Sequence, residues 1–221
     1  MSYDDPMSRV KLGSAQGRFR FLLLSVLGCA LLLGAASAKD VQIITRAGQN
    51  QMLAKPGTDA VGARNPDVTI VEYFDYNCGY CKRLVPALHA LLAQDHKIAI
   101  LYQDWPILGA VSMYAAASAL AAEWQGKYVL AHDALMNGPR LANNAQVDAT
   151  LQTAGVNMDA LKRDRASHAR EIAALLERND EEAHALSFTG TPGLVVGRQL
   201  WPGTADVGYL KQLVANSRHG K

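Results

Sequence analysis

The chain has 221 residues, of which 49% are hydrophobic and 19% are charged, and its formal net charge is +2. This length is enough for one domain with a core of ordinary size, with or without an insertion. The sequence has no low-complexity tract and no internal repeat, which excludes disordered and repeat proteins.

Residues 1–38 have the pattern of an export signal. Basic residues precede the uncharged apolar run Phe21–Leu33, and Ala36-Ser37-Ala38 provides a cleavage site of the small-x-small type. The wider apolar run Phe21–Ala38 reaches the lower length limit of a membrane span, so an uncleaved anchor is the alternative. Val26–Cys29 is a weaker match to a lipoprotein box. We favour cleavage after Ala38, and in either case expect a periplasmic or other extracytoplasmic location.

Removal of this segment changes the charge and the cysteine content. It carries four of the 22 basic and two of the 20 acidic residues, so the remainder is electrically balanced and we expect no nucleic-acid partner.

Of the three cysteines, Cys29 is lost and Cys78 and Cys81 remain. A disulfide between these two would close too small a loop to stabilise the fold much. A structural zinc site would need two more ligands, so redox chemistry without a metal is favoured.

Residues 39–66 are predicted to form an N-terminal connector. Lys55–Asp59 and Gly62–Pro66 are rich in turn-forming residues, and Val41–Ile44 has the composition of a short edge strand. The connector contains neither heptads nor a long amphipathic helix. We therefore expect no oligomerisation region and a monomeric protein.

The most informative stretch follows. Val68–Phe74 is β-branched and aromatic, which predicts a buried strand. A turn, with Asn77 as the expected cap, leads into Cys78-Gly79-Tyr80-Cys81. Apolar residues then recur at helical spacing, at Leu84, Val85, Leu88, Leu91 and Leu92.

This arrangement places the two cysteines on the first turn of a helix. The free N–H groups and the positive end of the helix dipole stabilise an anion there, so Cys78 is expected to be a thiolate near neutral pH. Cys81 lies one turn later on the same face, within reach of a disulfide with Cys78. Lys82 would also favour the thiolate, although a lysine on an exposed helix face is commonplace.

A strand, a Cys-x-x-Cys motif and a helix containing Pro86 together resemble the thioredoxin superfamily. The string Val71–Lys82, with Thr191-Pro192 far downstream, is similar to the DsbA branch and to its Com1-like group of exported thiol–disulfide oxidoreductases. The resemblance runs from about Asn65 to about Val214. It implies a thioredoxin-like α/β fold with an inserted helical subdomain. It also implies disulfide exchange with cysteine-containing exported proteins, no cofactor besides the Cys78–Cys81 pair, and a membrane redox partner.

The resemblance also implies roles for residues outside the cysteines. Pro192 matches the cis-proline loop that faces them, and the backbone of Thr191 would pair with an extended substrate peptide. Gly79 and Tyr80 would contact the substrate and tune the redox potential. Glu72 matches a buried acid that takes or relays the proton of the second cysteine, with a solvent-facing glutamate as the alternative.

The remaining elements complete this fold. Lys97–Tyr102 predicts a strand parallel to the first, and two short strands, Thr191–Val196 and Gln199–Trp201, predict a hairpin before a last helix capped by Asp206. We assign 67–111 and 187–218 to the thioredoxin-like domain and 112–186 to the helical insertion. The helices of the insertion are expected at 112–124, 125–136, 144–154, 158–165 and 167–186. One bent helix over the last two ranges is the alternative.

Other residue types in the insertion are expected to be structural. Core packing is expected for Met113, Met136, Met158, Trp124 and Tyr128. The histidines show no metal-ligand spacing, so we expect solvated side chains at His89, His96, His132, His168 and His184.

Three functions remain open from the sequence. The first is oxidation of substrate dithiols, the second is disulfide isomerisation or reduction, and the third is a chaperone-like peptide-binding module with incidental cysteines. Gly79-Tyr80 does not decide between the first two, because the residues between the cysteines act on the redox potential through local hydrogen bonds.

Overall fold

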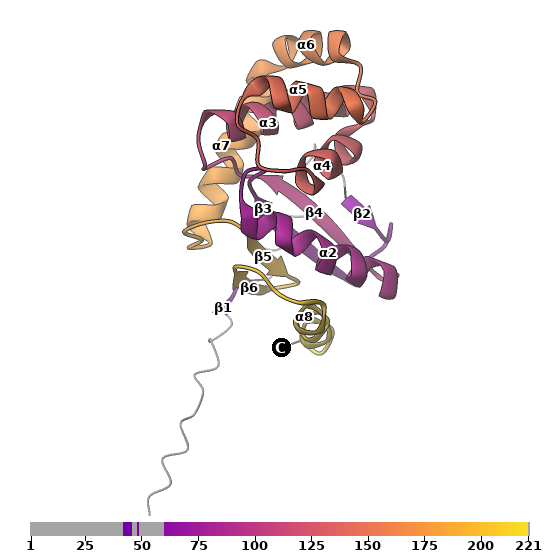
Figure 1. Ribbon diagram of the computed structural model, residues 1–221. Coiled ribbons are helices and arrows are strands. Elements are labelled where there is room, and N and C mark those ends of the chain that lie inside the picture. The colour runs from indigo at the N-terminus through magenta and orange to yellow at the C-terminus, as the bar shows by residue number, and fades with distance from the viewer. Residues whose placement is uncertain (1–41, 46–47, 49–59, 221) are drawn as a thin grey trace, which may run out of the picture. The chain divides into compact units, whose positions relative to one another are not determined.

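The computed structural model describes residues 42–45, 48 and 60–220 (Figure 1). The expected export signal, its cleavage site and the anchor alternative all lie outside these residues, as does most of the connector. Within the described part, no helix combines the length and the apolar character needed to cross a membrane.

The described chain contains a six-stranded mixed sheet with the order β1-β6-β5-β3-β4-β2. The central strand β3 (Val68–Phe74) pairs in parallel with β4 (Ile98–Asp104) and antiparallel with β5 (Gly193–Val196), which continues through a tight turn into β6 (Gln199–Pro202). This arrangement confirms the predicted thioredoxin-like α/β fold. The two edges are formed by short strands, β1 (Gln42–Ile43) and β2 (Ala60–Gly62).

Both faces of β3 are buried, which explains its nearly continuous apolar sequence. Ile70 and Phe74 point into the larger core, to which α2 (Gly79–Gln94) and α8 (Val207–Arg218) also contribute. Val71 and Tyr73 point to the opposite side and pack in a second core that includes Ala183 of α7. The strand is therefore fixed from both sides, and its carboxyl end delivers the chain directly to the two cysteines.

The helical insertion lies between β4 and β5 in the sequence. Gly126, with φ of +64°, ends its first helical stretch, and the side chains of Asn143 and Asn157 cap later helices by accepting hydrogen bonds from backbone N–H groups. Figure 1 shows the first helices of the insertion gathered at one end of the sheet. The elements are α3 (Ala110–Ala121), the 3₁₀ turn η1 (Ala122–Gln125), α4 (Tyr128–Asn137), α5 (Asn144–Thr153), α6 (Met158–Ser167) and α7 (Ala169–Ala185).

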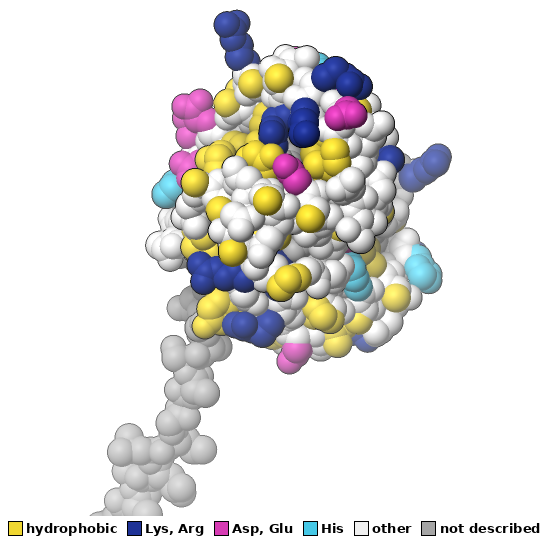
Figure 2. All heavy atoms as spheres, turned by 45° about the horizontal axis from the view of Figure 1, so that its top comes forward, with side chains coloured by type: hydrophobic (Ala, Val, Ile, Leu, Met, Phe, Trp, Pro, Cys, Tyr) yellow, Lys and Arg dark blue, Asp and Glu magenta, His cyan; other side chains and the backbone are white. Residues whose placement is uncertain are grey.

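The break between α6 and α7 falls at His168, which has non-helical dihedral angles, so 158–186 forms two helices and not one bent helix. The first helix of the insertion begins two residues earlier than expected and turns into η1. On the face of the molecule seen in Figure 2, basic and acidic side chains are interspersed with hydrophobic ones.

Three expectations about burial were wrong. Met113 and Trp124 were expected in the core, but their exposed fractions are 47% and 43%. His132 was expected to be solvated but is buried, with its ring stacked on Tyr102 at a centroid distance of 3.8 Å. Helical periodicity shows which residues share a face, but it does not show which faces other elements cover.

A glycine in the hairpin provides a test of the packing of α8. Gly197 has φ of +59°, and a Cβ atom there would lie 1.8 Å from Oγ and 2.9 Å from Cβ of Ser217. We expect Gly197→Ala to lower the free energy of unfolding by more than the roughly 1–2 kcal/mol of the left-handed backbone conformation, measured by urea denaturation.

The matched control is Gly126→Ala, at φ of +64° with no neighbour within 4 Å, which should show the backbone cost alone. Adding Ser217→Gly to Gly197→Ala should restore part of the loss. Equal destabilisation by the two single alanine substitutions would contradict a steric contribution from α8.

Candidate active site

Cys78 is the N-cap residue of α2, and Cys81 lies in the first turn of that helix, as the sequence predicted. The Cys78 carbonyl accepts the N–H of Lys82 at 3.1 Å, and its own N–H donates to the Asp75 carbonyl at 3.0 Å. The sulfur of Cys78 therefore lies where the first N–H groups of the helix have no backbone partner.

The expected capping role of Asn77 was wrong. Its amide group instead makes two hydrogen bonds with the backbone of Leu141: Oδ1 accepts from the Leu141 N–H at 2.8 Å, and Nδ2 donates to its carbonyl at 3.2 Å. These bonds tie the cysteine loop to the segment between α4 and α5. Because Leu141 is 64 residues away, no local sequence signal could have indicated this partner.

Asp75 organises the turn and was missed as a site residue. Its buried carboxylate accepts hydrogen bonds from the Asn77 N–H at 2.7 Å, the Leu108 N–H at 2.9 Å and the Ser112 hydroxyl at 2.7 Å. The bond to Asn77 is a local turn of a kind that aspartate often forms. The other two fix the loop between β4 and α3 against the cysteine loop.

The environment of Cys78 favours its thiolate. A hydrogen bond from the Cys81 thiol is the largest influence lowering the pKa of Cys78, to about 5, with further contributions from the Thr191 side chain and from backbone N–H groups in α2, while burial opposes them. In its protonated form the Cys78 thiol donates a hydrogen bond to the Thr191 carbonyl oxygen at 3.2 Å. At neutral pH Cys78 is therefore predominantly a thiolate, the reactive form of a thiol.

Cys81 has the opposite character. It is completely buried, and burial raises the pKa of its thiol far above the ordinary value, with additional increases from the hydrogen bond to Cys78 and the charge of Glu72. Both cysteines are free in the structure. The pair is thus divided into a charged, reactive sulfur and a neutral, protected one.

Thr191 and Pro192 lie next to this pair, although more than 100 residues separate them in sequence. The Thr191–Pro192 bond is cis, as the resemblance implied, and Pro192 is buried at the start of β5. The Pro192 carbonyl accepts the N–H of Gly203 at 2.7 Å, which fixes the loop to the end of β6.

Glu72 lies in β3 and is buried, with an exposed fraction of 1%, so the alternative of a solvent-facing glutamate is wrong. Its Oε1 has no hydrogen-bond partner among the described residues. Burial is the main cause that raises the pKa of Glu72 to about 8, and the charge of Cys78 adds to this increase. Glu72 is therefore mainly protonated at neutral pH. It lies close enough to both cysteines for its charge to interact with theirs.

The other residues of the motif lie nearer the surface. Tyr80 is 60% exposed, with the guanidinium of Arg83 4.3 Å from the centre of its ring, and Gly79 is exposed beside it. Lys82 is not free on an exposed helix face: its Nζ donates to the carbonyls of Leu135 and Met136 at the end of α4. Burial is the main cause that lowers the pKa of Lys82, to about 8.

A buried polar cluster lies beyond Glu72 on the same side of the sheet. The hydroxyl of Tyr128 donates to Asp104 at 2.7 Å, and Tyr76 is 3.3 Å from Nδ1 of His132. Burial raises the pKa of Asp104 to about 7 and lowers the pKa of His132 to about 3, so both side chains are uncharged or only partly charged at neutral pH. These residues come from separate elements, and sequence spacing did not connect them.

Within the described residues, no three histidine, cysteine, aspartate or glutamate side chains are arranged to hold a metal ion. The chemistry available from the residues present is that of two thiols with unequal proton affinities, a buried carboxyl group and an adjacent loop that contains the cis bond Thr191–Pro192.

Comparison with known proteins identifies the family. Residues 69–215 match the model of the DSBA-like thioredoxin domain. The chain belongs to this family.

Solved structures agree with this assignment. A thioredoxin-like oxidoreductase from Silicibacter pomeroyi is 36% identical, with a TM-score of 0.73, and the match covers 80% of this chain and 99% of the other. The thiol–disulfide exchange protein α-DsbA2 from Wolbachia pipientis is 26% identical, with a TM-score of 0.72, and the match covers 77% of this chain and 91% of the other.

A curated relative is much longer. The Na⁺/H⁺ antiporter NhaA 1 of Salinispora arenicola is 28% identical over 169 residues, which are 75% of this chain but 26% of the relative. The chain thus spans about a quarter of that protein.

The origin of the Cys78 thiolate can be tested in the reduced protein. Because the hydrogen bond from Cys81 is the largest influence lowering the pKa of Cys78, we expect Cys81→Ala to raise that pKa. Thr191→Ala should raise it less. The ultraviolet absorbance of the thiolate and the rate of alkylation, followed against pH, measure both shifts. An unchanged titration of Cys78 in Cys81→Ala would contradict this order of causes.

The buried carboxyl group should appear in the pH dependence of stability. Glu72 has a raised pKa, so the folded protein holds its proton more tightly than the unfolded chain, and its contribution to stability is lost as the pH rises from about 4.5 towards 8. The maximum slope from one proton is about 1.4 kcal/mol per pH unit. In a Cys78→Ser, Cys81→Ser background, Glu72→Gln should remove that slope, measured by denaturation at several pH values. Parallel curves with and without Glu72 would show that the carboxyl group titrates normally.

Proposed function

We propose that this member of the DSBA-like family is an exported enzyme that oxidises dithiols in other proteins through the Cys78–Cys81 pair. The observation that supports this most strongly is the position of the Cys78 sulfur at the start of α2, beside the Thr191 carbonyl and above the buried Cys81. The fold is that of thiol–disulfide oxidoreductases, which supports exchange chemistry in general. The oxidising direction, the substrates and the export are our inferences.

In the proposed reaction, a substrate thiolate attacks Cys78 of the oxidised enzyme. A bond forms between the substrate sulfur and Cys78 while the Cys78–Cys81 bond breaks, and Cys81 leaves as a thiolate. Because burial strongly disfavours this charge, Cys81 takes up a proton. Glu72, protonated at neutral pH, is the proposed donor, either directly or through a relay.

The second step releases the product. Another thiolate of the substrate attacks the substrate sulfur of the mixed disulfide, a disulfide forms within the substrate, and Cys78 departs as a thiolate. Two electrons have then passed from the substrate to the enzyme. The low pKa of Cys78 stabilises this reduced product, which makes the oxidised enzyme a stronger oxidant and favours oxidation over reduction.

The loop at Thr191 and Pro192 is proposed to hold the substrate backbone. The main chain of Thr191 would pair with an extended segment of the substrate next to its reacting cysteine, as in strand addition. Gly79 and Tyr80, which follow Cys78 in the chain and are exposed, would contact the same segment.

The remaining expectations about partners follow from this reaction. Each turnover leaves Cys78 and Cys81 reduced, so a membrane redox partner must reoxidise them, and no metal or organic cofactor is required. The export signal inferred at residues 1–38 would place the enzyme in the periplasm or a comparable extracytoplasmic compartment. We expect it to act as a monomer, without nucleic acid.

Trapping of the intermediate tests the assigned roles. With a disulfide-bonded substrate protein, the Cys78 thiolate of Cys81→Ala should attack the substrate disulfide and displace one substrate sulfur as a thiolate. The mixed disulfide should accumulate, because the Cys81 thiol that resolves it in this direction is absent, and it should appear on non-reducing gels and by mass spectrometry. Cys78→Ala should form none and should lose nearly all exchange activity. Mixed disulfides formed through Cys81 in the Cys78→Ala protein would reverse the assignment.

Measurements on the wild-type protein and on a variant lacking both cysteines separate the alternative functions. The solution mass of the wild-type protein is measured first. Its rate of oxidising a reduced protein is then compared with its rate of reactivating a protein with scrambled disulfides. Efficient reactivation by an oligomer that oxidises poorly would favour an isomerase. Retention of peptide binding and of biological activity in the protein lacking both cysteines would favour the binding module.

A further inference from the structure

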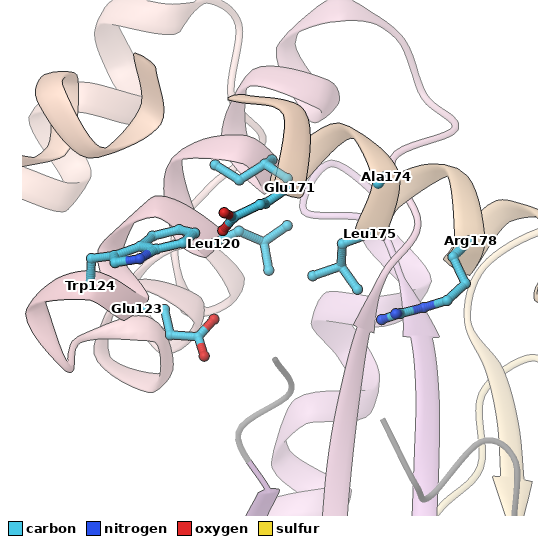
Figure 3. A pocket seen from close by; sticks show the side chains of 8 residues that line it. Leu120, Glu123, Trp124, Glu171, Ala174, Leu175 and Arg178 are labelled. Carbon is cyan, nitrogen blue, oxygen red and sulfur yellow. The ribbon is translucent and has the colours of Figure 1, made fainter. Parts of the chain in front are cut away.

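A cavity with a volume of about 580 Å³ lies in the helical insertion, away from the cysteine pair (Figure 3). It is bounded by α3, η1 and α7, and none of its lining residues belongs to the site described above. Its volume falls in the range of small-molecule binding sites. Most of the wall is apolar, formed by Leu120, Trp124, Ile172, Ala174 and Leu175.

Arg178 provides a positive charge at one end of the cavity. Its Nε and Nη2 are buried and have no hydrogen-bond acceptor among the described residues. Figure 3 shows its side chain extending from α7 toward the space beside Leu175. Buried polar groups without partners are costly, and a carboxylate matches the guanidinium in both charge and geometry.

Gln103 adds a second unpartnered polar group on this side of the sheet. It is completely buried, and neither Nε2 nor Oε1 has a partner among the described residues. Gln103 lies beside Tyr73 in the register of β3 and β4, and the charge of Arg178 also acts on Tyr73, where it opposes the effect of burial on the pKa. Gln103 does not line the cavity, so Arg178 is the lining residue with unused N–H groups.

The opposite end of the cavity has a different character. Trp124 is 43% exposed and stacks on His168 at a centroid distance of 3.8 Å. Glu123 and Glu171 lie beside Trp124, on the far side of the cavity from Arg178 (Figure 3). The lining residues at this end include no lysine or arginine, so a second anionic group would find no cationic partner there. The cavity thus suits an anion at Arg178 and an apolar body extending to Trp124.

We propose that this cavity binds an amphipathic monocarboxylate, such as a medium-chain fatty acid anion. The carboxylate pairs with Arg178, and the apolar body packs against Leu120, Leu175 and Trp124. This binding is separate from the exchange reaction proposed for Cys78 and does not depend on it.

Calorimetric titration of the purified protein with decanoate tests the proposal. We expect saturable binding at one site, with decanol and decanedioate bound about tenfold more weakly. Decanol lacks the charge, and decanedioate places a second carboxylate at the end of the cavity whose lining residues include no lysine or arginine. Arg178→Met should reduce decanoate affinity by about tenfold or more, to the level of decanol. The matched control is Arg170→Met, on the exposed surface of the same helix, which should leave binding unchanged.

A second variant separates the loss of a charge from the loss of the cavity. Ala174→Trp should fill the space and abolish binding of both decanoate and decanol. The far-ultraviolet circular dichroism spectrum should be unchanged in all three variants, which verifies that they are folded without reference to exchange at Cys78. Failure of decanoate to bind saturably to the wild-type protein would overturn the proposal, as would equal decanoate affinity in Arg178→Met and Arg170→Met.

Discussion

The stabilised negative charge on Cys78 is the interaction around which the site is built. A thiolate there accepts hydrogen bonds from the first turn of α2, from Cys81 and from Thr191. These donors belong to distant parts of the chain and meet at the carboxyl end of β3. The sheet makes this possible, because β3 is central and pairs with both the strand before the insertion and the strand after it. A small change in the register of β5 would move Thr191 away from the sulfur.

Differences in burial give Cys78, Cys81 and Glu72 different proton affinities. Cys78 retains some contact with solvent and with hydrogen-bond donors, whereas Cys81 and Glu72 are enclosed and favour their neutral forms. Negative charge is therefore concentrated on Cys78, the less enclosed of the two sulfurs. A low pKa of Cys78 stabilises the reduced pair relative to the disulfide. This stabilisation is the physical basis for the proposed oxidising direction.

The helical insertion is bound closely to the catalytic loop. Asn77 accepts a hydrogen bond from Leu141, and Lys82 donates one to a carbonyl at the end of α4. Asp75 accepts one from Ser112 at the start of α3. The insertion therefore helps to fix the position of the first turn of α2. Another part of the insertion, formed by α3, η1 and α7, carries the cavity at Arg178. One subdomain therefore contributes both to the surroundings of the cysteine pair and to a separate candidate ligand site.

The sequence by itself determined the features that depend on neighbouring residues. The apolar run before Cys78, the Cys-x-x-Cys spacing and the helical repeat after it are local, and they predicted a strand, a helix N-terminus and a thiolate there. The resemblance carried by Thr191-Pro192 supplied the distant loop. Only the tertiary structure decided the burial of Glu72 and His132, the exposure of Met113 and Trp124, and the partners of Asp75 and Asn77. The reason is that burial and long-range hydrogen bonds depend on which elements pack together. Local patterns in a single sequence do not reveal those contacts.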